Sequence, residues 1–453
     1  MKHILTLFAV FLMPLLCCAQ KEDYVWVMGN NIIDFNTTPP TVRENGDFAP
    51  EPGLTSVCDK DGNLKYWING NRVYNKNSEE IYTSMSIQDI EHLNSLTLFS
   101  MPGSETNYIY MHLDYKTKII HFTEIDGSKD ELHPEFKDFA SLSYNGCSPV
   151  LIQKKYSRDF WLLHQDANTF NVYSITKNGL FLHSTKTFDK EIYDDDFFRI
   201  NDSRIANSQT LIYTYVLGMP DDLLYMYFDF DCINGLITDM TLYHNGSDFM
   251  EGEAFTQNDK FFYFFFCGED YKDYDKIFRC PVDKLKEKDA LKKYRKVAYN
   301  SMNHSIDDIK MGPDGNIYFL DSYNPEYVGV IYNSEDDNPI VNPNGIKMAQ
   351  PSKTDRWVAK FPYTYHYPFA VSYTRDCHDF TFSFSESEYE SIVWNFGDGT
   401  AEVRNVEKPT HTFADDGKYT VNLTVTLTDG IVRQYSTEVE ITTPKAPRII
   451  VEE

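Results

Sequence analysis

The chain has 453 residues, of which 68 are Asp or Glu and 42 are Lys or Arg, so that its formal net charge is −26 at pH 7. Such an acidic chain is not expected to bind nucleic acid or an anionic membrane face, because both need a positively charged surface. Hydrophobic residues make up 42% and aromatic residues 15% of the sequence, which excludes a disordered chain. At about 150 residues per domain, the length predicts two or three domains.

The amino terminus predicts export. An apolar run over residues 4–16 follows a short basic start, and small residues follow the run. This pattern is typical of a signal peptide over residues 1–19, since the run is too short to span a bilayer as a stable helix. Cleavage after Ala19 would release a secreted, soluble chain that begins at Gln20.

A second interpretation of the same segment is a lipoprotein. Leu15-Leu16-Cys17-Cys18 resembles a bacterial lipobox, in which Cys18 would be acylated and become the first mature residue. The charged stretch directly after it resembles the export signal of surface lipoproteins in the Bacteroidetes. Cys17 departs from the Gly, Ala or Ser that is usual there, so both interpretations stay open. No later run reaches about 18 apolar residues, so a lipid would be the only membrane anchor of an outer-membrane or cell-surface protein.

Six of the eight cysteines remain once Cys17 and Cys18 are set aside, an even number in an oxidising compartment. Cys267 and Cys280 end two apolar runs that a polar, acidic stretch separates, so they are candidates for a disulfide across one hairpin. Buried free thiols are the alternative. The sequence contains no C-x-x-C spacing, which argues against a zinc site.

Residues 24–365 consist of short strand-like runs rich in Tyr, Phe, Ile and Val. The run 261–266 is apolar at every position, which predicts a strand buried on both faces. An all-β region is therefore expected. Turn dipeptides that tolerate a positive φ separate the runs, at Asp61-Gly62, Asp126-Gly127, Asn178-Gly179, Asn234-Gly235, Asn245-Gly246 and Asp314-Gly315.

The spacing of these hairpins favours a propeller. A four-stranded blade takes about 40 to 50 residues, so that a region of about 340 residues corresponds to about seven blades. No Pro- and Gly-rich linker divides the region into separate sandwiches. We therefore predict a seven-bladed β-propeller over residues 24–365. One or two turns of solvated helix are expected over residues 282–296, where Leu285 and Leu291 lie among charged residues.

The pattern changes near residue 370. The runs 380–384 and 419–427 alternate between apolar and polar residues, which predicts an antiparallel sandwich. The order W-N-F-G-D-G, H-T-F and G-K-Y-T-V resembles the polycystic-kidney-disease (PKD) domain. The resemblance implies an immunoglobulin-like sandwich over residues 370–445, followed by a tail of residues 446–453. It implies a structural role for the motif residues Trp394, Phe396, Gly397, Asp398, Gly399, His411, Phe413, Gly417, Tyr419 and Val421.

The larger region resembles the propeller that precedes PKD domains in secreted, gliding-associated proteins of the Bacteroidetes. The similarity spans roughly residues 24–340, and its segments occur in order, from D-K-D-G-N-L at residues 59–64 to G-P-D-G-N-I-Y at residues 312–318. Those relatives usually end in a sorting domain for type IX secretion, whereas this chain ends at Glu453. The departure puts type IX export in doubt and favours the lipoprotein route.

No catalytic residue, metal site or cofactor is predicted, because nucleophile-elbow, phosphate-loop and zinc-protease motifs are absent and the 12 His show no ligand spacing. Acidic clusters at residues 194–196, 270–275 and 335–337 could hold Ca²⁺, but they lack the spacing of an EF-hand loop, so solvated loops are favoured. Tyr363, Tyr365 and Tyr367 alternate along the connector, where they serve either a binding face or packing between domains.

These features lead to the expectation of a non-enzymatic binding or adhesion protein that is exported and stays at the cell surface. The propeller face would recognise a glycan or a protein, with the PKD-like domain as spacer or second binding module. Two alternatives remain: a propeller enzyme that acts on glycans as hydrolase or lyase, and a scaffold subunit of an outer-membrane assembly. Fold alone does not separate them, since propellers host many functions.

Overall fold

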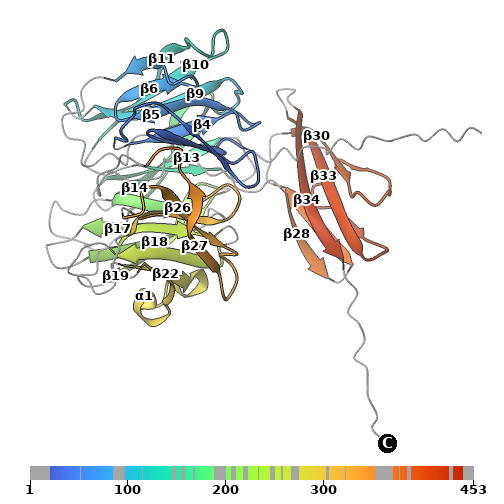
Figure 1. Cartoon of the computed structure of the whole chain (residues 1–453). Helices are drawn as coiled ribbons and strands as arrows, with labels where there is room; N and C mark the ends of the chain where they lie inside the picture. Colours follow the sequence, from blue (N-terminus) through green and yellow to red (C-terminus); the bar gives the residue numbers. More distant parts are fainter. Residues whose placement is uncertain are drawn as a thin grey trace, which may run out of the picture. The chain divides into compact units, whose positions relative to one another are not determined.

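Figure 1 shows a computed structural model of the whole chain. Contacts within the chain divide it into two compact units, described over residues 21–351 and 371–441. The predicted signal peptide, with Cys18, lies outside the described residues. The structure describes residues 21–51, 53–84, 97–114, 116–144, 149–154, 159–166, 169–187, 200–205, 211–217, 223–232, 234–244, 250–256, 259–266, 275–301, 306–321, 323–351, 371–376, 378–384, 389–427 and 432–441.

Seven antiparallel sheets make up the described part of the first unit, and each joins strands that follow one another along the chain. This confirms the all-β prediction. Sheets 1 to 3 contain β1 (Val25–Met28), β2 (Asn31–Asp34) and β3 (Thr41–Glu44); β4 (Thr55–Cys58), β5 (Leu64–Asn69), β6 (Arg72–Asn75) and β7 (Glu80–Thr83); and β8 (Thr97–Ser100), β9 (Asn107–Asp114), β10 (Ile119–Asp126) and β11 (Glu135–Ser143).

The remaining four sheets have four strands each. Sheets 4 and 5 contain β12 (Val150–Gln153), β13 (Phe160–Asp166), β14 (Thr169–Thr176) and β15 (Gly179–Thr187); and β16 (Ile200–Ile205), β17 (Leu211–Leu217), β18 (Leu223–Asp231) and β19 (Leu236–His244). Sheets 6 and 7 contain β20 (Met250–Phe255), β21 (Phe261–Phe266), β22 (Lys276–Pro281) and β23 (Lys296–Asn300); and β24 (Ile306–Met311), β25 (Ile317–Asp321), β26 (Tyr327–Tyr332) and β27 (Ile340–Lys347).

Two short helices lie between β22 and β23, the 3-10 turn η2 (Val282–Lys284) and α1 (Ala290–Lys293). Leu285 and Leu291 are buried in a hydrophobic cluster of sheet 6. The predicted helical turns over residues 282–296 are therefore confirmed. None of the helices in the described ranges has the length and hydropathy of a membrane span.

Strand β21 is buried along its whole length, as its apolar run predicts. Successive side chains of a strand point to opposite faces of the sheet. The even-numbered residues of 261–266 share a cluster with Tyr227 of sheet 5. The odd-numbered residues share another cluster with Ile309 and Phe319 of sheet 7. Sheet 6 therefore has a packing layer on each face.

Hydrophobic clusters join the other sheets in the same way. Six clusters each combine residues of two successive sheets, from sheets 1 and 2 to sheets 6 and 7. A seventh cluster combines residues of sheet 7 with residues of sheet 1. The order of these contacts is therefore cyclic.

The contact between the first and last sheets joins aromatic rings and buried amides. The ring centroid of Trp26 lies 4.7 Å from that of Phe35 and 5.4 Å from that of Tyr318. Nearby, the Asn31 side chain donates to the carbonyl oxygen of Gln350 and accepts from the Gln350 main-chain N–H, both at 3.0 Å. Asn31 is completely buried. One amide side chain thus links two segments that lie far apart in the sequence.

The second unit is a sandwich of two antiparallel sheets. One face of each sheet contributes to a single aromatic and aliphatic core. The strands predicted over residues 380–384 and 419–427 lie within β29 and β33. The first sheet contains β28 (Val371–Asp376), β29 (Asp379–Phe384) and β32 (Thr410–Thr412), and the second contains β30 (Tyr389–Asn395), β31 (Val403–Arg404), β33 (Gly417–Leu427) and β34 (Val432–Ile441).

Replacing Asn31 tests the contact between sheets 1 and 7. Asn31→Ala should lower the denaturation midpoint of the first unit, because it removes both hydrogen bonds to the Gln350 main chain, which are partly buried. Each such hydrogen bond contributes about 0.5–1.5 kcal/mol. Denaturant titration followed by Trp fluorescence measures the change. Asn338→Ala, at an exposed position of the same unit, is the control and should leave the midpoint unaltered; equal midpoints for both variants would contradict the assigned role.

Candidate functional site

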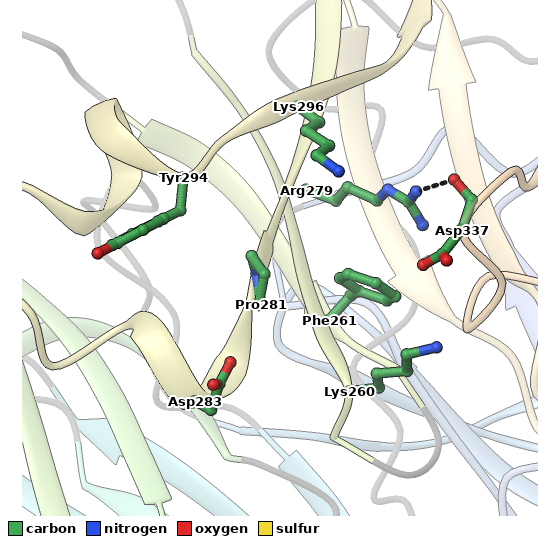
Figure 2. Close-up of a pocket in the computed structure, with 8 residues that line it drawn as sticks. All are labelled: Lys260, Phe261, Arg279, Pro281, Asp283, Tyr294, Lys296 and Asp337. Atoms are coloured by element: carbon green, nitrogen blue, oxygen red, sulfur yellow. Dashed lines mark hydrogen bonds between the residues drawn. The ribbon is translucent and has the colours of Figure 1, made fainter.

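A pocket of about 280 Å³ lies where sheet 6 meets the turn between β26 and β27 of sheet 7 (Figure 2). Its volume is close to the lower end of the range of about 300–1,000 Å³ that small-molecule sites occupy. The lining side chains combine three positive charges, two negative charges and three rings. They are Lys260, Arg279, Lys296, Asp283, Asp337, Phe261, Tyr294 and Pro281.

The turn of residues 334–337 is held on sheet 6 through its main chain. The Tyr263 hydroxyl donates to the first of its four carbonyl oxygens at 2.8 Å, and Lys260 Nζ donates to the second at 2.7 Å. The Arg279 guanidinium donates to the third and the fourth. Hydrogen bonds to four successive carbonyl groups therefore fix one wall of the pocket.

Arg279 is buried, with 4% of its surface exposed. Its guanidinium carbon lies 4.4 Å from the centroid of the Phe261 ring. Burying a charged group is costly unless other contacts replace its hydration, and here the carbonyl oxygens and the aromatic face do so. None of these partners carries a formal negative charge. The positive charge of Arg279 is therefore solvated by dipoles and not neutralised.

The cations of the pocket exceed its anions. Within the described residues, Lys260, Arg279 and Lys296 form no ion pair. Asp283 pairs instead with its neighbour Lys284, with 3.4 Å between nitrogen and oxygen. This local excess of positive charge occurs in a chain of net charge −26. A concave site with such a reversal of sign attracts anionic groups.

The contact between sheets 2 and 3 is a useful comparison within the same unit. There the Tyr66 hydroxyl donates to the carbonyl oxygen of Glu131 at 3.1 Å, as a tyrosine does in the pocket. The lysines, however, pair with a carboxylate. Nζ of Lys65 lies 2.8 Å from Oε1 of Glu131, and Nζ of Lys76 lies 3.2 Å from Oε2 of the same residue. Cations without a carboxylate partner are therefore not a general requirement for holding one sheet to the next.

Cys280 carries a free thiol, so the disulfide expected between Cys267 and Cys280 is not formed. In the hairpin of β21 and β22, the residue opposite Cys280 is Phe262, and β21 continues for four residues beyond it before position 267. In the described register, Cys280 therefore lies opposite Phe262 and not opposite a cysteine. Burial raises the pKa of the Cys280 thiol to about 12, so the thiol is protonated and has the character of a small apolar side chain. Cys267 itself lies outside the described residues.

Most other positions singled out in the sequence fall outside the described residues. The acidic cluster 335–337 is described, and its carbonyl oxygens accept from Lys260 and Arg279. Asp275 is also described and lies 3.5 Å from Lys276. Over the described ranges, no three His, Cys, Asp or Glu side chains are grouped as a metal site. The positions outside are Cys18, residues 194–196 and 270–274, Tyr363, Tyr365 and Tyr367.

The PKD-like motif gathers at the core and at one turn of the sandwich. The Trp394 indole N–H donates to the carbonyl oxygen of Val406 at 2.9 Å, and Tyr419 packs against the core. Gly417 begins β33. Four motif residues are buried in the core, namely Trp394, Phe396, Phe413 and Val421.

The turn after β30 requires glycine. Gly397 has a φ of 77° and Gly399 a φ of 85°, in the region that other residues rarely adopt. A Cβ atom on Gly397 would lie 2.3 Å from the carbonyl oxygen of Thr420. Gly397 therefore allows the turn to approach β33 closely, and Gly399 is required only by its positive φ.

Asp398 joins this turn to β32. Its Oδ2 atom lies 2.7 Å from Nε2 of His411, and its Oδ1 atom accepts from the hydroxyl and the main-chain N–H of Thr400 at 2.6 and 3.1 Å. The His411 ring stacks on Phe396, with 3.9 Å between centroids. Burial opposes ionisation of Asp398, but hydrogen bonds from Thr400 and His411 outweigh it and lower the pKa of the carboxyl group. These contacts give Asp398 and His411 a structural role.

Sequence reasoning missed the pocket, because its lining residues come from separate segments that only the packing of two sheets brings together. One signal was present. Arg279 interrupts the apolar residues Ile277, Phe278, Cys280 and Pro281. A charged residue inside a buried strand needs partners, and searching for those partners would have led to the turn of residues 334–337.

Comparison with known proteins supports the PKD-like fold of the second unit most directly. Residues 372–443 match the model of the PKD domain family. The first PKD domain of the metalloprotease PrtV from Vibrio cholerae is 23% identical, with coverage of 16% of this chain and 93% of that chain and a TM-score of 0.15. No curated protein sequence is significantly similar to this chain.

Solved structures similar to a larger part of the chain include a β-propeller. Hydrazine synthase from Kuenenia stuttgartiensis is 13% identical, with coverage of 70% of this chain and 97% of that chain and a TM-score of 0.43. The β-propeller domain of Cps50 (Swd1) from Myceliophteria thermophila is 8% identical, with coverage of 67% and 91% and a TM-score of 0.38. The match at residues 372–443 confirms that the chain carries a PKD domain.

The Asp398 contacts predict a pH-dependent stability of the sandwich. Because the folded state lowers the pKa of Asp398, the ionised carboxylate stabilises the fold above the unfolded pKa of about 3.9, and this contribution is lost as the pH falls through the folded pKa. Asp398→Asn should therefore destabilise the sandwich by about 1–3 kcal/mol near neutral pH, and the deficit should shrink below about pH 4. Thermal unfolding followed by circular dichroism measures both effects.

A surface pair of the same unit is the control. Nε2 of His378 lies 3.6 Å from Oδ1 of Asp416, and the Asp416 side chain is 51% exposed. Asp416→Asn should change the stability by less than about 1 kcal/mol. Equal losses in the two variants, or a deficit of Asp398→Asn that does not depend on pH, would count against the role given to Asp398.

Proposed function

We propose that this chain is an exported binding or adhesion protein of the cell surface, without enzymatic activity. Its first unit, residues 24–365, is a seven-bladed β-propeller with one blade for each sheet, and its PKD domain is a spacer or a second binding module. The cyclic order of the hydrophobic clusters supports the propeller. A PKD domain fits an extracellular protein.

The observation that carries this proposal is the pocket between sheets 6 and 7. Its wall is held in place by hydrogen bonds to four successive carbonyl groups. Lys296 and Asp337 line the pocket and, within the described residues, form no ion pair. A concave site whose walls are already ordered loses little entropy when a ligand binds. A glycan or a protein would be the ligand.

One observation favours glycan hydrolysis as a second candidate. Asp283 and Asp337 line the same pocket and lie on opposite sides of it in Figure 2. Glycoside hydrolases use two carboxyl groups that flank the scissile bond. Binding and hydrolysis are therefore best tested together.

The lipoprotein form of the proposal predicts that the mature chain begins at an acylated Cys18. Cys18→Ser should move the protein from the membrane fraction to the soluble fraction, because it removes the sulfur that carries the lipid. Cys17→Ser is the matched control and should retain the lipid, since Ser is usual at that position. Intact-mass spectrometry of the mature chain distinguishes the forms, and a chain that begins at Gln20 would refute the lipid anchor.

Binding is tested with the mature chain on panels of purified glycans and of extracellular matrix proteins. We expect saturable binding to at least one class with a Kd at or below about 1 mM, and no release of reducing ends from any glycan. Release that Asp337→Asn abolishes would establish the hydrolase instead. A folded chain that binds neither panel would overturn the proposed function.

A further inference from the structure

We propose that the pocket between sheets 6 and 7 binds an acidic sugar, a uronic acid residue of a glycan. Lys296 and Lys260 would hold the carboxylate, and Asp283 and Asp337 would accept hydrogen bonds from the hydroxyl groups. This inference rests on the proposed binding function and names the ligand class of the same site. It follows from the charge, the polarity and the size of the pocket.

The charges of the lining favour an anionic ligand. Lys296 is the exposed first residue of β23, and Figure 2 shows its side chain extending toward Arg279. Arg279 uses its donors on the turn of residues 334–337 and keeps its positive charge. Two like charges side by side repel each other, and an anion placed beside them removes that repulsion. The ammonium group of Lys296, which forms no ion pair within the described residues, is the available donor for such an anion.

The two carboxylates restrict the kind of anion. Asp283 and Asp337 would repel a ligand that is anionic on every side, such as phosphate or sulfate. They accept hydrogen bonds well from hydroxyl groups, which a sugar carries around its ring. A neutral sugar, in turn, would leave the cations without an anionic partner. A ring with one carboxylate and several hydroxyl groups matches both parts of the lining.

The size of the pocket and the covered Phe261 ring favour a single charged sugar residue. A volume of about 280 Å³ suits one sugar residue better than an extended chain. The Phe261 ring is already covered, with the Arg279 guanidinium at 4.4 Å and Lys260 Nζ at 5.2 Å from its centroid. This ring is therefore not free to stack on a neutral sugar. Recognition would depend on charge and hence on the ionic strength.

The test is calorimetric titration of the mature chain with trigalacturonate and with a hyaluronan tetrasaccharide, which contains glucuronate. Binding of either probe is expected, and methyl esterification of its carboxylates should weaken binding at least about tenfold. Lys296→Gln should cause a loss of similar size. Lys347→Gln is the matched control, since it removes the same charge from an exposed position at the other end of the β26–β27 hairpin.

Three results would overturn the inference: no binding of either uronate probe, equal binding of the methyl ester, or unchanged affinity of Lys296→Gln. Tighter binding of an acidic peptide of matched charge would assign the pocket to a protein ligand instead. Both lysines are exposed, so thermal unfolding should show that the two variants fold as the wild type does. Binding of another glycan or protein elsewhere on the chain would leave the proposed function standing while this inference fails.

Discussion

Each sheet of the first unit contributes buried apolar residues to a cluster on either face, and the rest of the structure depends on covering both faces. Strand β21, with six buried residues, needs a packing layer on either side. A linear stack of such sheets would leave its two end faces in water, where burial gains nothing. The contact of Trp26 with Tyr318 covers those end faces together. Because this contact joins the first sheet to the last, it completes the burial of all the sheets between them.

The pocket is a consequence of the same packing. When one sheet packs on the next, a turn of one lies over strands of the other, and the carbonyl groups of that turn need donors. On sheet 4 the Trp161 indole N–H donates to the carbonyl oxygen of Cys232, and on sheet 2 Tyr66 and paired lysines hold the turn. On sheet 6 two of the three donors are cations, Lys260 and Arg279, which form no ion pair in the part of the chain that the structure describes. The contact that holds sheet 7 on sheet 6 therefore carries a positive charge that can bind a ligand.

The PKD domain also has to bury the apolar faces of its sheets, but it has fewer such faces. Its two sheets have one buried face each, so a single core is enough and no cyclic arrangement is required. Its motif combines core aromatics with a tight turn: Phe396 enters the core while Gly397 lets the chain approach β33. Asp398 and His411 then tie that turn to the opposite sheet. The motif is recognisable because these demands fall on neighbouring residues.

Local pattern alone determined the all-β class, the doubly buried strand at residues 261–266, the helical turns near residue 285 and the PKD domain, because each of these depends on residues close together in the chain. Tertiary structure decided what depends on distant segments. Register placed Phe262, and not a cysteine, opposite Cys280. Packing of sheet 7 on sheet 6 brought Asp337 to Arg279 and created the pocket. No local sequence pattern predicts this contact between distant segments. The charge balance of the site depends on which side chains the fold brings together.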